Sequence, residues 1–232
     1  MIEISLVQKV VAWVLPVLLA ITVHEAAHGL MARRFGDTTA QMLGRLTLNP
    51  LKHIDPVGTV IVPLVMLLLP GGYLFGWARP VPVNTRNLKH PKSDMAWVAA
   101  AGPGANLLMA LGWALLVRFA VLLGNNNPFG WPMLYMGVAG IFINSSLFVL
   151  NLLPIPPLDG GRVVTGLLPL KAANVYSRIE PYGMWILLAL LFTHTLGRIL
   201  WPVLSYLLTV LSLFAGIGTQ NFERILQSLL GG

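Results

Sequence analysis

The sequence contains no cysteine and few charged residues. Without cysteine the chain can form neither disulfides nor thiolate metal sites, so any bound metal must be held by His, Asp or Glu. Only 10% of the 232 residues are charged, whereas 56% are hydrophobic. Because soluble domains carry about 25% charged residues, this composition excludes a soluble protein and indicates an integral membrane protein. No cleavable signal peptide is expected, since Glu3 precedes Lys9 at the N-terminus.

Long apolar runs predict an all-α polytopic protein with about five to six transmembrane segments, because a span needs about 20 apolar residues. No internal repeat is present. The length suits one compact domain, so we expect residues 1–232 to form a single membrane-embedded domain, with a core at 6–180 and additional C-terminal membrane helices at 181–217. The expected segments are 6–34, 95–123, 132–153, and one or two more within 181–196 and 199–217.

Residues 38–84 interrupt this helical pattern. Residues 38–50 show partial alternation and turn-forming residues, which favour a short strand or loop. The apolar run at 57–69 is too short for an ordinary span, and a Pro-rich aromatic stretch follows at 73–84. Non-helical backbone at membrane depth is tolerated only where protein or a water cavity satisfies it. We therefore expect 38–84 to form a re-entrant, β-like hairpin or loop region.

The distribution of Lys and Arg predicts the orientation. If 57–84 is re-entrant and the C-terminal end of the first span faces the cytoplasm, twelve of the fifteen basic residues fall on that side. This asymmetry agrees with the positive-inside rule. We expect a multi-pass protein of a prokaryotic plasma (inner) membrane, with its active site towards the cytoplasm. The twelve are Arg33, Arg34, Arg45, Lys52, Arg79, Arg86, Lys89, Lys92, Arg162, Lys171, Arg178 and Arg224.

Three ionisable side chains, His24, Glu25 and His28, lie in the first apolar run. Such groups cost several kcal/mol in hydrocarbon unless they are paired or ligated. The spacing of the two histidines puts both imidazoles on one helix face, where they could bind one metal ion, while Glu25 points to the adjoining face. This is the H-E-x-x-H arrangement of zinc peptidases. The alternative is that hydrogen bonds satisfy the histidines and that Glu25 is a surface acid.

A catalytic zinc takes three protein ligands and a water, so one further His, Asp or Glu is needed. Asp159 is the preferred residue, because it follows a Pro-rich break and precedes Gly160 and Gly161, which permit close backbone approach. The alternative for Asp159 is an N-cap of the helix that follows. The other residues considered are Asp37, His53, Asp55, His90, Asp94 and Glu180.

Four sequence motifs, and the order in which they follow one another, make the chain resemble the site-2 proteases. These are intramembrane zinc metalloproteases of the M50 type. The resemblance covers residues 10–180. The motifs are His24-Glu25-Ala26-Ala27-His28, Phe75-Gly76-Trp77-Ala78-Arg79-Pro80-Val81-Pro82-Val83-Asn84, Ala101-Gly102-Pro103-Gly104-Ala105-Asn106, and Asn151-x-x-Pro154-x-x-x-Leu158-Asp159-Gly160.

The resemblance implies one catalytic Zn²⁺ and a role for each site residue. Glu25 would be the general base, and Asn151 would bind the substrate backbone or its developing oxyanion. The expected zinc ligands are His24, His28 and Asp159. Asn106 either orients a neighbouring ligand and contacts substrate, or only bridges helices.

The expected function is therefore hydrolysis of peptide bonds in or near transmembrane helices of membrane-protein substrates, at a site near the cytoplasmic face. The expected partners are a transmembrane protein substrate and the lipid bilayer, with no nucleic acid. The chain lacks the PDZ insertion of larger family members. The alternative is a metal transporter or channel that uses the same ligands as a transit site. A transporter would not need Glu25, and usually shows repeats. An inactive adaptor would not need the intact ligand set.

Overall fold

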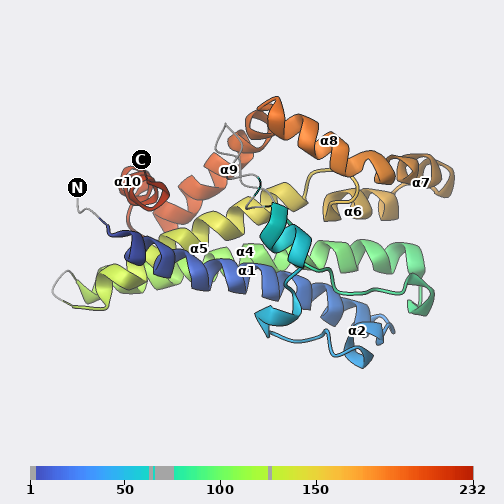
Figure 1. The fold of residues 1–232 in the computed structure, drawn as a ribbon, viewed down its shortest axis with the longest axis horizontal. Helices are drawn as coiled ribbons and strands as arrows, with labels where there is room; N and C mark the ends of the chain where they lie inside the picture. Colours follow the sequence, from blue (N-terminus) through green and yellow to red (C-terminus); the bar gives the residue numbers. More distant parts are fainter. Residues whose placement is uncertain (1–3, 63–64, 66–75, 125–126, 232) are drawn as a thin grey trace. The chain divides into compact units, whose positions relative to one another are not determined.

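The computed structural model describes residues 4–62, 65, 76–124 and 127–231. Every regular element in these residues is helical (Figure 1). The long helices are α1 (Leu6–Arg34), α4 (Pro91–Leu123), α5 (Gly130–Asn151) and α9 (Thr195–Phe214). The shorter ones are α2 (Thr39–Met42), α6 (Asp159–Leu167), α7 (Leu170–Tyr176), α8 (Glu180–Phe192) and α10 (Thr219–Leu230). Single turns of 3₁₀-helix lie at η1 (Pro50–Lys52), η3 (Thr85–Asn87) and η4 (Ser177–Ile179), and a π-helix lies at η2 (Pro56–Ile61).

Four of the described helices, α1, α4, α5 and α9, are long and apolar enough to cross a membrane. The expectation of an all-α integral membrane protein is confirmed at this level. The segment expected at 181–196 forms α8, which has 13 residues. At 1.5 Å per residue such a helix reaches about 20 Å, less than the roughly 30 Å of a bilayer core. A total of five to six spans therefore stays a prediction.

The expected β-like element is not formed by the described residues of 38–84. They contain α2, η1, η2 and extended backbone. Two isolated bonds, from Arg79 N–H to the His53 carbonyl (2.9 Å) and from Trp77 N–H to the Gly58 carbonyl (3.0 Å), join its parts. Pro80 and Pro82 have no N–H to donate, so a continuous ladder cannot extend past them. The expected re-entrant turn falls largely on 63–64 and 66–75, outside the described residues.

The chain folds into two compact units. The first contains Met1–Ala20, Pro103–Asn151 and Ile199–Gly232, and the second contains Ile21–Gly102 and Leu152–Arg198. The prediction of one functional domain over 1–232 stays a prediction.

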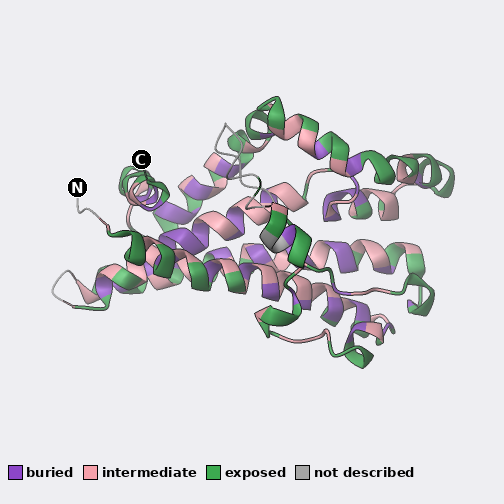
Figure 2. Ribbon diagram, in the orientation of Figure 1, coloured by how far each residue is buried: buried purple, intermediate pink, exposed green. Residues whose placement is uncertain are grey.

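Small residues let the helices of the first unit pack closely. A Cβ at Gly140 would lie 2.3 Å from the Trp113 ring, and one at Gly137 would lie 2.4 Å from Val117 Cγ2. Such residues let helix backbones approach within a membrane, where apolar burial provides no driving force. Nine positions of α5 are buried, and Figure 2 shows them along this helix. The apolar core of this unit comes from α1, α4, α5, α9 and α10.

Asp37, just after α1, connects separate segments of the second unit through hydrogen bonds. Its side chain is 1% exposed and accepts hydrogen bonds from Thr39, from the Asn84 N–H (2.7 Å) and from Asn87 Nδ2 (3.0 Å). Burial raises the pKa of the Asp37 carboxyl, but the hydrogen bonds from Thr39, Asn87 and Asn84 together lower it below its ordinary value. Asp37 therefore ties the segment around 84–87 to the end of α1.

Replacing Asp37 with alanine should destabilise the protein by about 3 kcal/mol, because four hydrogen-bond donors lose a buried acceptor. Thr39→Val removes only one hydroxyl of the same cluster, which donates to Asp37 and accepts from Asn87 Nδ2, and should cost only about 1 kcal/mol. Because the folded pKa is depressed, the ionised form stabilises the protein above the ordinary pKa of 3.8, and this contribution is lost as the pH falls below it. Unfolding in detergent, followed against pH, measures both effects. Equal stability of Asp37→Ala and wild type would contradict this role.

Candidate metal centre

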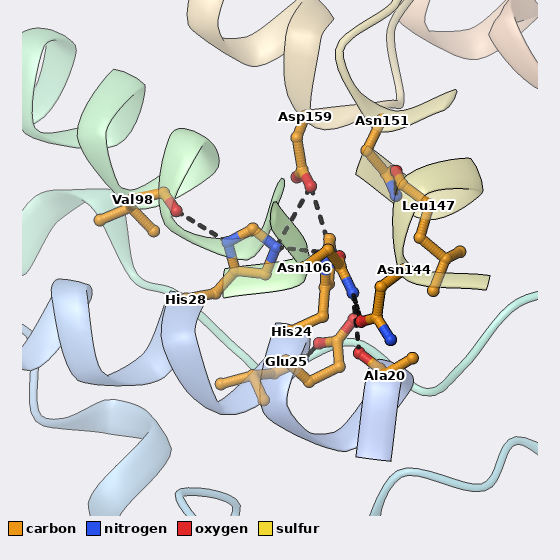
Figure 3. Close-up of polar contacts among 11 residues, drawn as sticks. Ala20, His24, Glu25, His28, Val98, Asn106, Asn144, Leu147, Asn151 and Asp159 are labelled. Atoms are coloured by element: carbon orange, nitrogen blue, oxygen red, sulfur yellow. Dashed lines mark hydrogen bonds and ion pairs between the residues drawn. The ribbon is translucent and has the colours of Figure 1, made fainter. Parts of the chain in front are cut away.

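Three side chains of the second unit bring their donor atoms together. His24 and His28, one turn apart on α1, place their Nε2 atoms 3.1 Å from each other. Asp159 Oδ2, from the first residue of α6, lies 3.3 Å from each of them. Figure 3 shows the Asp159 carboxylate pointing at the two imidazoles. In the described part of the chain this is the one group of three such residues close enough to hold a metal ion.

The size of this triangle suits zinc. Zinc bonds to imidazole nitrogen and carboxylate oxygen measure about 2.0–2.1 Å, so donors at the corners of a tetrahedron lie about 3.3 Å apart. The three distances between donor atoms are 3.1, 3.3 and 3.3 Å. Asp159 Oδ2 is also buried without a hydrogen-bond partner among the described residues. A buried, unsatisfied carboxylate oxygen beside two imidazole nitrogens is a donor set that a divalent cation satisfies.

A backbone carbonyl of α4 determines the orientation of His28. His28 Nδ1 lies 2.7 Å from the Val98 oxygen (Figure 3). A carbonyl can only accept, so Nδ1 carries the hydrogen and the neutral ring keeps its lone pair on Nε2, toward His24 and Asp159. This is the arrangement in which a metal-binding histidine is oriented by a second hydrogen bond.

Gly102 makes room for both imidazoles. A Cβ at this position of α4 would lie 2.4 Å from His28 Nε2 and 2.7 Å from His24 Cε1. Real Cβ contacts under 3.0 Å essentially never occur, so only glycine lets α4 pass so close to the two rings. The small-residue motif around Gly102 therefore packs closely against α1 at the site itself.

The glycines after Asp159 allow a second close approach, between the start of α6 and the loop that precedes it. A Cβ at Gly160 would lie 2.4 Å from the carbonyl oxygens of Leu152 and Leu153, so the start of α6 presses against the preceding loop. The residue at the N-cap position is Leu158, and Asp159 is the first helical residue. Asp159 is therefore not the N-cap of α6.

The other residues considered as third ligand lie elsewhere. Within the described residues, each of them has its own place or partner away from His24 and His28. Asp37 binds the donors described above; His53 contacts the Thr47 carbonyl; Asp55 caps η2; His90 and Asp94 pair at the start of α4; and Glu180 lies in the first turn of α8.

Two asparagines from the sequence motifs belong to the first unit. Asn106 is fully buried and donates to the Ala20 carbonyl (3.2 Å) and to Asn144 Oδ1 (3.0 Å), and therefore bridges helices. Asn144, in turn, donates to the Gly140 carbonyl (2.9 Å). Asn151 donates to the Leu147 carbonyl (3.0 Å), one turn earlier on α5. The substrate-binding roles expected for Asn106 and Asn151 stay predictions.

Glu25 is held by a loop. Its Oε2 accepts a 2.7 Å hydrogen bond from the backbone N–H of Val81. Sequence patterns could not indicate this contact or the Val98 carbonyl, because backbone groups are present at every position. Gly102 did carry a signal, the run Gly102-Pro103-Gly104, but its contact with the imidazoles was not foreseen.

A helical membrane protein with a His-His-Asp triangle, whose aspartate is buried, and a glutamate next to its first histidine, has the components of a metal-dependent hydrolase. The profile described as "Peptidase family M50" matches residues 126–194. The chain is 40% identical over 201 residues to "Putative zinc metalloprotease YwhC" of Bacillus subtilis (strain 168), covering 83% of this chain and 85% of that protein. It is 30% identical to "Putative zinc metalloprotease Rip2" of Mycolicibacterium smegmatis over 190 residues (78% and 66%) and of Mycobacterium tuberculosis H37Rv over 191 residues (82% and 70%).

The chain therefore belongs to peptidase family M50, the family of the site-2 proteases. No solved structure matches it significantly.

Proposed function

We propose that this protein is a zinc-dependent intramembrane endopeptidase, which hydrolyses peptide bonds in or near transmembrane helices of other membrane proteins. The observation that carries the proposal is the triangle of His24, His28 and Asp159 donors with Glu25 beside it, on a helix apolar enough to span a bilayer. Metalloprotease chemistry is supported by membership of the peptidase family and by relatives that are named zinc metalloproteases.

The zinc ligands are His24, His28 and Asp159. A zinc ion held there supplies Lewis-acid polarisation of the scissile carbonyl and makes water a stronger nucleophile near neutral pH. The protein's part is to keep the two neutral imidazoles and one carboxylate in place, through the Val98 carbonyl and the close approach at Gly102.

Glu25 is the general base. Its carboxylate takes a proton from the attacking water, whose oxygen forms the new bond to the carbonyl carbon. The same carboxyl group then returns the proton to the amide nitrogen as the C–N bond breaks, so that a carboxylic acid and an amine leave. Asn151 assists by donating to the substrate backbone or to the developing oxyanion.

The substrate is a single-pass transmembrane protein, cleaved close to the cytoplasmic face of a prokaryotic plasma membrane. Its helix must unwind locally, because an intact helix satisfies its own amide groups and hides the scissile bond. The asymmetry of Lys and Arg supports this orientation, since the basic residues near the C-terminal end of α1 and the N-terminal end of α4 would face the cytoplasm.

Removal of the metal tests the proposal. Purified protein in liposomes with a single-pass substrate should release two fragments, and chelation with phenanthroline should abolish the reaction. Added zinc should restore cleavage, because hydrolysis depends on the bound ion. Comparing membrane-protein fragments in cells that carry the wild type or Glu25→Gln would identify substrates.

A parallel measurement of zinc entering the vesicles separates the protease from a transporter. Zinc uptake that persists in Glu25→Gln, without any cleavage by the wild type, would contradict the proposal.

A further inference from the structure

One backbone hydrogen-bond donor faces the Glu25 carboxylate. Val81 stands between Pro80 and Pro82, neither of which has an N–H. The Val81 N–H is therefore the only backbone donor of this tripeptide, and it lies 2.7 Å from Glu25 Oε2. Hydrogen bonds to an ionised carboxylate are shorter and about twice as strong as neutral ones.

The side chain of Val81 packs on the same face of α1, one turn further along. Val81 is 7% exposed. A Cβ at Gly29, four residues after Glu25, would lie 3.1 Å from Val81 Cγ1 and 3.0 Å from Leu46 Cδ1. Gly29 thus leaves the space that Val81 occupies. The loop therefore contacts α1 twice, through its N–H at Glu25 and its side chain at Gly29.

The backbone on both sides of Val81 is anchored within the second unit. Arg45 Nη2 donates to the Arg79 carbonyl (2.9 Å) and to the Pro80 carbonyl (3.4 Å). The Asn84 N–H donates to Asp37 (2.7 Å). These bonds, which do not involve the metal ligands, limit the movement of the 79–84 segment relative to α1.

We propose that the Val81 N–H is a positioning group for the general base Glu25. A carboxylate that accepts an N–H on Oε2 has one oxygen fixed and presents Oε1 to the water. General-base catalysis requires that oxygen within hydrogen-bond reach of the proton it removes. Orienting the base in advance lowers the barrier. This inference rests on the proposed role of Glu25 in hydrolysis.

The experiment compares three variants reconstituted with zinc. Val81→Pro removes the N–H; the residue before Pro82 is already restricted to extended conformations that proline adopts. Val81→Ala keeps the N–H and loses only packing. Val83→Pro is the matched control, because the Val83 N–H has no hydrogen-bond partner among the residues that the structure describes. Zinc content, kcat and KM are measured for each on one single-pass substrate.

We expect kcat of Val81→Pro to fall by about 10- to 100-fold, the value of a hydrogen bond to a charged group, with KM and zinc content unchanged. Val81→Ala should lose less, and Val83→Pro should match the wild type. A merely structural role would change KM or zinc content together with kcat. Loss of zinc from Val81→Pro, or a kcat equal to or above that of the wild type, would overturn the proposal.

A spectroscopic measurement keeps this test separate from the proposed function. The chain has only four glutamates, Glu3, Glu25, Glu180 and Glu223. With ¹³C-labelled glutamate, the infrared difference between wild type and Glu25→Gln isolates the Glu25 carboxylate band. This band should shift in Val81→Pro and stay in place in Val83→Pro. If the wild type cleaves nothing, the proposed function fails; if the band does not shift, the contact with Val81 fails.

Discussion

Replacing Glu25 with glutamine is expected to abolish hydrolysis while zinc stays bound. Glutamine has the same size and still offers an oxygen to the Val81 N–H, so the site should keep its geometry. It cannot accept the proton of the attacking water, and loss of a general base costs about 10²- to 10⁴-fold in rate. Zinc content by mass spectrometry and fragment release in liposomes measure the two properties separately.

Removing one of the proposed metal ligands should have a different outcome. His28→Ala and Asp159→Ala should lose both zinc and cleavage, because two donors do not hold a catalytic zinc. Glu180→Ala is the matched control: it removes an acid in the first turn of α8 and should keep zinc and activity. Cleavage by Glu25→Gln at the rate of the wild type would show that the assigned mechanism is wrong.

The second large effect is expected at a glycine without any chemistry of its own. Gly102→Ala should weaken zinc binding by about 10- to 100-fold, the usual cost of disturbing the groups that orient metal ligands. The added methyl group would collide with His28 Nε2 at 2.4 Å, and displacing that ring also breaks its bond to the Val98 carbonyl. Zinc affinity is measured by competition with a chelator.

Gly104→Ala provides the control on the same helix. A Cβ there meets nothing within 4 Å. Both substitutions replace glycine by alanine inside α4, so both gain a similar helix propensity of about 1 kcal/mol, and only the collision differs. Gly104→Ala should therefore keep zinc and unfold at an equal or higher temperature. Wild-type zinc affinity in Gly102→Ala would disprove the steric role of Gly102.

Much of the class of this protein could be predicted from local patterns. The scarcity of charge predicted a helical membrane protein, and four described helices are apolar enough to span a bilayer. The four motifs predicted the M50 family, which the relatives confirm. The re-entrant, β-like hairpin or loop region expected over 38–84 is not confirmed, because the residues described there form no strand. Alternation and turn-forming residues indicate extended backbone. A strand also needs a partner strand, and a segment that contains proline cannot form a continuous row of hydrogen bonds with one.

The sequence by itself determined which donor chemistry was available and the pairing of His24 with His28, because a helix repeats every 3.6 residues and needs no other part of the chain to align them. The Pro-rich break and the two glycines also favoured Asp159 as the third donor, but only the tertiary structure brought it, rather than another acid of the described residues, to these imidazoles. It also placed the Val98 carbonyl on His28 and the Val81 N–H on Glu25. Such contacts depend on how distant segments pack, and a backbone donor or acceptor leaves no mark in the sequence. Gly102 shows how far sequence reasoning reaches. The sequence shows that this residue has no side chain, but only the structure shows that the two imidazoles occupy the space.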